Sequence, residues 1–369
     1  MAQAHWVEEA CRQAIGKIER TSLSVGATFP NGSAHGRYEK TPPHDWVVGF
    51  WPGLLWLAYR ETNNEQLKEL AVDCERQISR TLWEFEQLHH DVGFMFELSS
   101  INQYETTQDA EAKRHALMAA SLLAGRFNPA GEFIRAWPNW GGEDHSGWAI
   151  IDCLMNLPLL YWASREIEDP RYRLIAERHA NTVLREFVQD DGSVHHIVSF
   201  DPATGERIKA IGGQGYAADS AWARGAAWAL YGFALSYAHT GKDEYLQASK
   251  KVAGFFLGHL PEDKVPYWDF KLPSIDEHTP RDSSAAAIAA SGLLDLAAAL
   301  PEEEGEAYKQ QAEAILYSLY RDYGAWDSEE EALLLHATGY YAAGVYVDAP
   351  LIYGDYYFVE ALLKLKKSW

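Results

Sequence analysis

The chain has 369 residues, of which 47% are hydrophobic and 13% aromatic, and its formal net charge is −21. This composition supports a large buried core. The negative charge argues against nucleic acids and anionic membranes as partners, and no apolar run approaches the roughly 20 residues of a transmembrane helix.

The N-terminal segment from Met1 to Ser24 mixes charged and apolar residues and lacks the apolar core and cleavage site of a signal peptide. We therefore expect a cytoplasmic protein. The three cysteines, Cys11, Cys74 and Cys153, are too few and too scattered for a disulfide framework or a CxxC metal pair. We expect them to be buried, apolar side chains.

Six segments carry charged residues on one face and apolar residues at helical spacing, which predicts amphipathic helices. In chain order they are His5–Val25, Glu65–Phe85, Asp109–Phe127, Arg171–Phe187, Glu244–His259 and Glu304–Tyr323. Six segments that are far more apolar alternate with these amphipathic ones. Each begins at or near an aspartate: Asp45, Asp91, Asp152, Asp219, Asp282 and Asp355.

A helix that is apolar nearly all round is buried, whereas an amphipathic helix covers a core. Six alternations therefore predict an all-α fold, an (α/α)6 barrel of six inner and six outer helices, forming one domain over residues 1–369. An open solenoid is the alternative, but its repeats would be more even. Aspartate suits a helix N-cap, so we expect the six aspartates to cap the inner helices around one mouth.

Two connecting segments do not read as helix. The run from Gly192 to Val198 has turn residues followed by β-branched ones, which is typical of a short strand. The glycine-rich segment from Gly212 to Tyr216 predicts a loop, because glycine is costly inside a helix.

Aromatic residues near the inner-helix starts suit a carbohydrate site, which combines aromatic platforms with fixed polar groups. Trp46 and Trp222 each lie close to one of these aspartates, and we favour them as pocket residues. The alternative is that they fill a wide helical core, as most buried aromatic residues do.

Three polar positions are candidates for chemistry. Asp91 follows His89 and His90, which permits a metal site, but no zinc-type spacing accompanies it and an N-cap is the simpler interpretation. Asp152 stands among apolar residues, where burial would raise its pKa and let it act as an acid, or where it could be structural. Arg224 lies in an apolar helix start and should face a carboxylate, from the protein or from a substrate.

Taken in order, these segments resemble the unsaturated glucuronyl hydrolases of glycoside hydrolase family 88 over nearly the whole chain. Family 105, which acts on unsaturated galacturonyl-rhamnose, shares the fold and is the close alternative. The segments are Asp45-Trp46-x-x-Gly49-Phe50-Trp51-x-Gly53, His89-His90-Asp91-x-Gly93-Phe94, Ile151-Asp152-Cys153, Trp222-x-Arg224-Gly225-x-x-Trp228, Tyr267-Trp268-Asp269-Phe270, Arg281-Asp282-Ser283-Ser284-Ala285 and Gly354-Asp355-Tyr356.

The resemblance implies roles for individual residues. Asp152 occupies the position of the general acid/base, and Asp91 that of the second essential carboxylate. Seven residues match positions that contact the sugar, although the match is loose after Leu333; they are Trp46, His196, Gln214, Trp222, Arg224, Trp228 and Tyr340. The resemblance also implies an unsaturated uronyl oligosaccharide as substrate and no metal or organic cofactor.

Two other classes stay open at this point. A sugar epimerase on the same barrel would need a histidine pair, which His89 and His90 offer. A non-catalytic glycan-binding protein would use the same aromatic residues. The sequence does not indicate the oligomeric state or the parent polysaccharide. The loop from Ala337 to Gly344 has no lysine, where some family members that accept sulfated substrates carry one.

Overall fold

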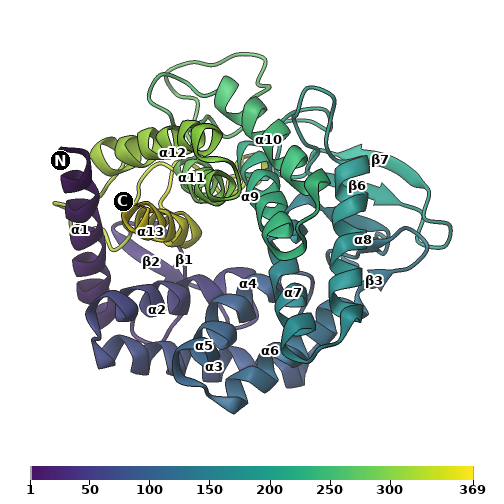
Figure 1. The fold of residues 1–369 in the computed structure, drawn as a ribbon, viewed down its shortest axis with the longest axis horizontal. Coiled ribbons are helices and arrows are strands. Elements are labelled where there is room, and N and C mark those ends of the chain that lie inside the picture. Colours follow the sequence, from purple (N-terminus) through teal and green to yellow (C-terminus); the bar gives the residue numbers. More distant parts are fainter. Residues whose placement is uncertain (1, 369) are drawn as a thin grey trace.

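Two concentric layers of helices form the protein in the computed structural model, which describes residues 2–368, with side chains from residue 5 (Figure 1). The outer layer consists of α1 (Ala2–Val25), α3 (Glu65–Glu84), α6 (Ala110–Gly125), α8 (Pro170–Glu186), α10 (Asp243–Gly258) and α12 (Glu302–Asp322). These match the six predicted amphipathic segments.

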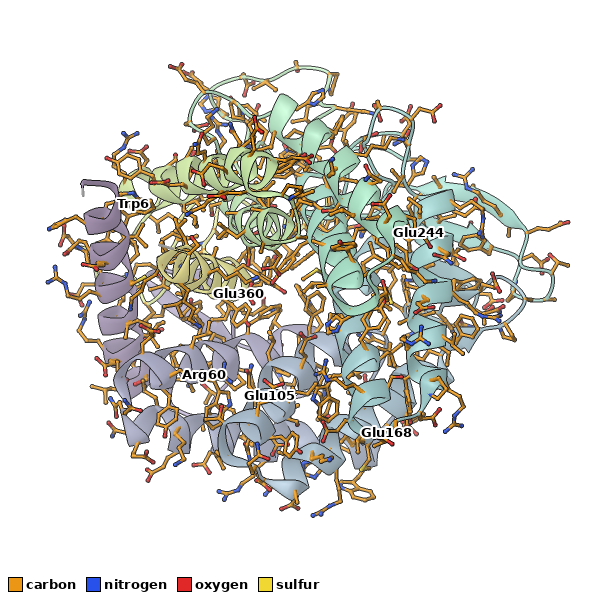
Figure 2. All side chains as sticks on the ribbon, in the orientation of Figure 1. Trp6, Arg60, Glu105, Glu168, Glu244 and Glu360 are labelled. Atoms are coloured by element: carbon orange, nitrogen blue, oxygen red, sulfur yellow. The ribbon has the colours of Figure 1, made fainter. Side chains whose placement is uncertain are left out.

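The inner layer alternates with the outer one along the chain. It consists of α2 (Phe50–Thr62), α4 (Val92–Phe96) with its continuation α5 (Asn102–Thr107), α7 (Leu157–Glu166), α9 (Ala223–Thr240), α11 (Ser283–Ala298) and α13 (Ile352–Lys367). A π-helical stretch, Glu97–Ile101, joins α4 to α5. The predicted (α/α)6 barrel is confirmed. In Figure 2, Glu360 of α13 points inward, while Trp6 and Glu244 lie at the periphery.

Small residues let the inner helices approach one another. A Cβ atom on Gly292 of α11 would lie 2.7 Å from side-chain atoms of Leu230 and Tyr231 on α9. A Cβ atom on Gly232 would lie 2.4 Å from Cβ of Leu154. Because interiors are close-packed, larger residues at these two positions would separate the inner helices.

The predicted aspartate caps are confirmed at only two helices. Asp45 accepts the backbone N–H of Val47, and Asp282 accepts those of Ser284 and Ala285. The prediction is wrong for the other four, whose carboxylates cap nothing for different reasons. Asp91 stands at the N-cap position without a capping bond, Asp152 lies inside a 3₁₀ turn (Ile151–Asn156), Asp219 lies in the loop before α9, and Asp355 lies within the first turn of α13.

Short strands connect the helices at one end of the barrel. They form the hairpins β1 (Pro30–Ala34) with β2 (Arg37–Lys40) and β3 (Phe127–Asn128) with β4 (Phe133–Ile134), and a sheet of β5 (Trp148–Ile150), β6 (Ile197–Phe200) and β7 (Arg207–Ile211) in that order. The predicted strand over Gly192–Val198 is correct only from Ile197. Antiparallel pairing of Ile150 with Ile197 brings His196 beside the segment that carries Asp152.

The three cysteines are free and buried, as predicted. Among the helices of residues 2–368, none combines the length and apolarity needed to cross a membrane.

Candidate active site

The starts of the inner helices meet at one mouth of the barrel. Trp46, in a 3₁₀ turn (Trp46–Gly49) before α2, packs on Phe94 of α4 and Tyr353 of α13, with ring centroids 5.6 and 5.0 Å apart. Arg224 of α9 bonds Asp282 at the start of α11. These contacts agree with the expectation that one mouth gathers the polar residues.

Asp152 is a carboxyl group at this mouth with a strongly raised pKa. Its side chain is 17% exposed, and its Oδ1 atom is buried without a hydrogen-bond partner. Burial, reinforced by the negative charge of Asp91 and opposed by Arg224, raises the pKa of Asp152 to about 7. Such a group is protonated in part at neutral pH and can both donate and accept a proton.

Asp91 has the opposite electrostatic setting. Burial alone would raise its pKa, but the ring nitrogens of His89 and His90, each 3.3 Å from Oδ2, and the amide of Asn156 outweigh burial. The pKa of Asp91 is therefore below its ordinary value. Two carboxyl groups with pKa values driven apart are a common arrangement for dividing acid and anion roles.

Asn156 connects the two carboxylate-bearing segments, and no sequence motif predicted this role. It is fully buried, and its Nδ2 donates to Asp91 Oδ1 (3.3 Å) and to the Asp152 carbonyl (3.4 Å). Its Oδ1 accepts the Phe94 N–H at 2.8 Å. The glycine at position 93 makes room for it, because a Cβ there would lie 2.4 Å from Asn156 Cα. Asn156 therefore fixes Asp91 relative to Asp152.

His196 approaches Asp152 from β6. Its Nδ1 accepts the backbone N–H of Gln214 at 2.8 Å, and its Nε2 lies 3.9 Å from Asp152 Oδ1. Burial lowers the pKa of His196 to about 3, so the ring is neutral; the Gly212 carbonyl also lies 3.2 Å from its Nδ1. The ring also packs on Trp222 with centroids 4.4 Å apart. Nε2 and the facing Asp152 oxygen both lack hydrogen-bond partners.

Arg224 is 2% exposed and binds protein groups through both terminal nitrogens. Nη1 donates to Asp282 Oδ2 (2.8 Å) and the Thr338 carbonyl, and Nη2 donates to Gln214 Oε1 (2.8 Å) and the Gly339 carbonyl. The carboxylate expected beside Arg224 is thus a protein aspartate. The guanidinium ties Gln214 and the loop after α12 to the barrel.

The remaining predicted site residues differ in exposure. Trp228 is 1% exposed and packs on Phe94 and Tyr357, which places it in the core beneath the site. Tyr340 is 38% exposed, in a loop whose neighbouring residue, Tyr341, stacks on Trp268 at 4.3 Å.

Residues 18–366 match the model of Glycosyl Hydrolase Family 88. The unsaturated glucuronyl hydrolase of Bacillus sp. (strain GL1) is 39% identical over 98% of this chain and 97% of that protein. The chain belongs to glycoside hydrolase family 88.

Two further family 88 comparisons agree. The unsaturated chondroitin disaccharide hydrolase of Streptococcus pyogenes serotype M1 is 38% identical over 88% of this chain and 82% of that protein. The crystal structure of the Bacillus sp. GL1 enzyme matches with a TM-score of 0.94 and 38% identity, covering 98% of this chain and 97% of that one. The chain is therefore a glycoside hydrolase, and the resemblance inferred from its sequence motifs is confirmed.

A cleft of about 420 Å³ includes Trp46 and His89 in its lining, whereas Asp152 and Asp91 do not line it. Trp46 was predicted as a pocket residue, and Trp137 and Trp140, which were not, also line this cleft. These two tryptophans come from the segment between β4 and β5, and their rings meet edge to face at 5.3 Å. A Trp-Pro-Asn-Trp run outside regular structure was the available signal.

His89, His90 and Asp91 form the group of metal-type ligands found among the described residues, with ligand atoms within 4.8 Å of one another. The contacts of His89 and His90 with Asp91 equally fit a carboxylate that two imidazole rings hold in place without a metal. That the enzyme works without a metal stays a prediction from the family resemblance.

Proposed function

We propose that the protein hydrates the C4=C5 double bond of the unsaturated uronic acid at the non-reducing end of lyase-generated oligosaccharides. The observation that carries the proposal is Asp152, a carboxyl group with a pKa near 7 and a buried oxygen that no protein group engages. The activities in the names of the Bacillus and Streptococcus relatives support it.

The substrate is a vinyl ether conjugated to a carboxylate. In the proposed reaction, the protonated Asp152 donates its proton to C4, and positive charge develops at C5 and the ring oxygen. The Asp152 carboxylate then takes a proton from a water molecule that adds at C5. The hemiketal so formed opens and releases the remaining sugar, and Asp152 is again protonated.

We propose that Asp91 stays ionised throughout. Its negative charge raises the pKa of Asp152, which keeps the acid protonated. The same charge stabilises the positive charge that develops on the sugar ring in the transition state. This division of labour differs from an ordinary glycosidase, in which two carboxyl groups act at the anomeric carbon.

The substrate contacts remain proposals. We propose that the partnerless Nε2 of His196, 3.9 Å from Asp152, and the ring of Trp222 that packs on it contact the substrate directly, and that Trp46 does so as well. Gln214 and Arg224 would act in part through each other, since they are hydrogen bonded. Trp228 would support the site from below, and Tyr340 would contact the outer part of the oligosaccharide.

We also propose that residues 1–369 act as one catalytic domain and that the enzyme works in the cytoplasm; the location rests on the sequence alone.

Isotope labelling in heavy water tests the reaction. Hydration should remove the ultraviolet absorbance of the conjugated double bond and place one deuterium stereospecifically at C4 of the earliest product. Early sampling is needed, because C4 lies beside the new ketone and exchanges later. A matched saturated glucuronide should not be cleaved. Rapid cleavage of the saturated compound, or an unlabelled C4, would instead support direct attack at the anomeric carbon.

A further inference from the structure

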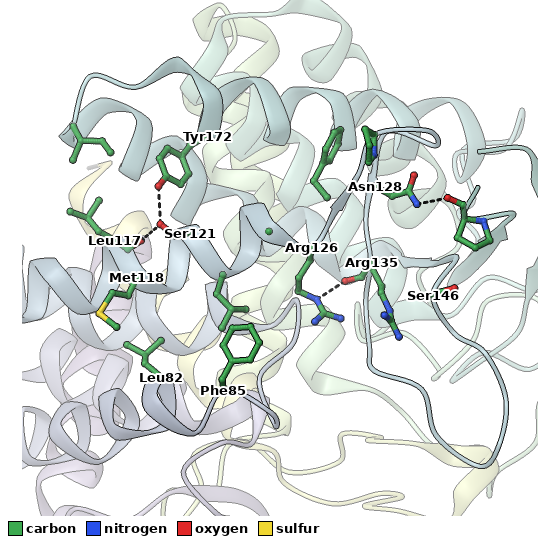
Figure 3. A pocket seen from close by; sticks show the side chains of 16 residues that line it. Leu82, Phe85, Leu117, Met118, Ser121, Arg126, Asn128, Arg135, Ser146 and Tyr172 are labelled. Atoms are coloured by element: carbon green, nitrogen blue, oxygen red, sulfur yellow. Dashed lines mark hydrogen bonds between the residues drawn. The ribbon is translucent and has the colours of Figure 1, made fainter. Parts of the chain in front are cut away.

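A second groove lies on the outer side of the barrel, and none of the candidate active-site residues lines it. Its volume is about 980 Å³, and it runs between α3, α6 and the β3–β4 hairpin. Figure 3 shows Leu82, Leu117 and Met118 along it, with Phe85 beneath and Tyr172 at the far side. The walls are mostly apolar, but Arg126 and Arg135 stand together at one end.

Both guanidinium groups are held in place by neutral oxygens. Arg126 donates from Nε to the Arg135 carbonyl and from Nη2 to the Ala136 carbonyl, both at 2.9 Å. Arg135 donates from Nε to the Trp137 carbonyl (2.9 Å) and from Nη2 to Asn139 Oδ1 (2.7 Å). These bonds fix the two planes and leave Nη1 of each arginine without a protein acceptor.

Within the described residues neither arginine forms an ion pair, although the negative charge of Asp91 acts on Arg126 and opposes the lowering of its pKa. Within the described residues, no carboxylate lies within the 4.0 Å of an ion pair with Arg126 or Arg135. The charge of Arg135 has only a small effect on Asp144, because the pKa of Asp144 is lowered mainly by hydrogen bonds from Ser146. In a chain with 53 acidic and 32 basic residues, two adjacent unpaired arginines are the reverse of what random pairing would produce.

The pair is also costly to keep. Burial and the nearby charge of Arg135 lower the pKa of Arg126 to about 10. A bound anion would offset both the cost of burying Arg126 and its repulsion from Arg135. Charge-assisted hydrogen bonds from preoriented guanidinium groups are among the strongest in proteins.

We propose that this groove is a second ligand site, which takes an organic anion: a carboxylate on a ring. The carboxylate would bind Nη1 of Arg126 and Arg135, and the ring would lie on the apolar wall formed by Phe85, Leu117 and Met118. The groove is larger than an inorganic ion requires and falls within the size range of small-molecule sites. An acidic sugar and an aromatic acid share this chemistry.

Fluorine NMR of 4-fluorobenzoate is the direct test on the whole chain. The wild type should bind the probe, and the double variant Arg126→Gln/Arg135→Gln should raise the Kd at least about tenfold, since it removes two charged donors. The matched control is Lys209→Gln/Lys251→Gln, which removes the same charge from exposed positions. It should bind as the wild type does.

A competition experiment then distinguishes an acidic sugar from an aromatic acid as the ligand. Displacement of the probe by D-glucuronate assigns the site to acidic sugars, and failure to displace it assigns the site to aromatic acids. Equal Kd values for the wild type and the arginine double variant would overturn the proposal, as would equally tight binding of neutral 4-fluorobenzyl alcohol.

Chemical footprinting keeps the test valid if the double variant does not fold. Phenylglyoxal modifies accessible arginines, and peptide mass spectrometry of the wild type should show Arg126 and Arg135 protected by benzoate. Arg80, exposed on α3, is the internal control and should be labelled equally with and without benzoate. Unchanged labelling of Arg126 and Arg135 at saturating benzoate would contradict the proposal.

Discussion

Asp152, which is partly exposed, and Asp355, which is buried, are two aspartates of the inner layer whose pKa values are both raised to about 7, mainly by desolvation. Their surroundings differ. Asp355 accepts the backbone N–H groups of Leu333 and Leu334 at 2.7 and 2.9 Å and the hydroxyl of Tyr38. Asp152 has a buried oxygen without any partner.

The difference separates a structural carboxyl group from a reactive one. At Asp355, the protein itself supplies the hydrogen bonds, so the carboxylate joins α13 to the loop before it and to β2. At Asp152, the protein leaves a polar atom unsatisfied, which costs stability unless a ligand bonds to it. A raised pKa alone therefore does not identify the acid; the missing partner does.

The largest expected effect comes from Asp152→Asn. The amide is nearly isosteric but cannot exchange the proton, so kcat should fall more than about a hundredfold, the usual scale of general acid–base catalysis. Loss of ultraviolet absorbance measures the rate, and calorimetry should show that the variant still binds an unsaturated disaccharide.

Asp355→Asn is the matched variant. It should leave kcat within a few-fold of the wild type and lower the free energy of unfolding by about 1–3 kcal/mol, because one acceptor atom is lost. Near-normal turnover by folded Asp152→Asn would move the acid role elsewhere, most directly to Asp91.

Asn156→Ala should have the next largest effect. Removing the amide frees Asp91 from Asp152 and leaves the Phe94 N–H unsatisfied. We expect kcat to fall about tenfold with KM nearly unchanged, since misplacement of catalytic groups costs mainly the chemical step. The pH profile of kcat/KM should also shift, which a purely structural role would not cause. Asn102→Ala, in α5, is the control and should keep both the rate and the profile.

The pH dependence of stability should report the raised pKa of Asp152, and the absolute loss of stability should distinguish it from Asp355. A carboxyl group with a raised folded-state pKa binds its proton more tightly when folded, so its contribution is complete below about pH 4 and is lost as the pH rises through about 7. Asp152→Asn avoids that loss. Its stability relative to the wild type should thus improve between pH 5 and pH 8, by on the order of 2 kcal/mol.

Thermal unfolding at the two pH values measures this difference. Asp355→Asn should be destabilised at both, because it loses an acceptor for backbone N–H groups. For turnover, kcat/KM of the wild type should decline above about pH 7 as Asp152 ionises. A flat profile up to pH 9 would be inconsistent with Asp152 as the acid.

The smallest effect concerns sulfated substrates. The loop from Ala337 to Gly344 has no cationic side chain, and the one guanidinium that holds it, Arg224, is occupied by protein oxygens. Because a buried sulfate needs charged or N–H donors, kcat/KM should be a few-fold lower for a sulfated disaccharide than for its unsulfated form. Higher kcat/KM on the sulfated form would show that cations from elsewhere reach the site.

The sequence by itself determined the layered helical barrel, because hydrophobic periodicity is local and each helix has to bury the face that its own residues define. It also pointed to Asp152 and Asp91 as the pair, through motifs that resemble family 88. The position of Asp355 in an equally apolar segment looked the same, and nothing local distinguished the two.

Only the tertiary structure decided which aspartate lacks a partner. Asn156 reaches Asp91 across 65 residues, Arg224 reaches Thr338 across 114, and Tyr38 reaches Asp355 across 317. Hydrogen-bond satisfaction depends on such long-range contacts, and pKa shifts depend on burial and on charges brought close by folding. The sequence could therefore propose an acid at Asp152, while the folded chain determined why Asp152 and not Asp355 is left free to act.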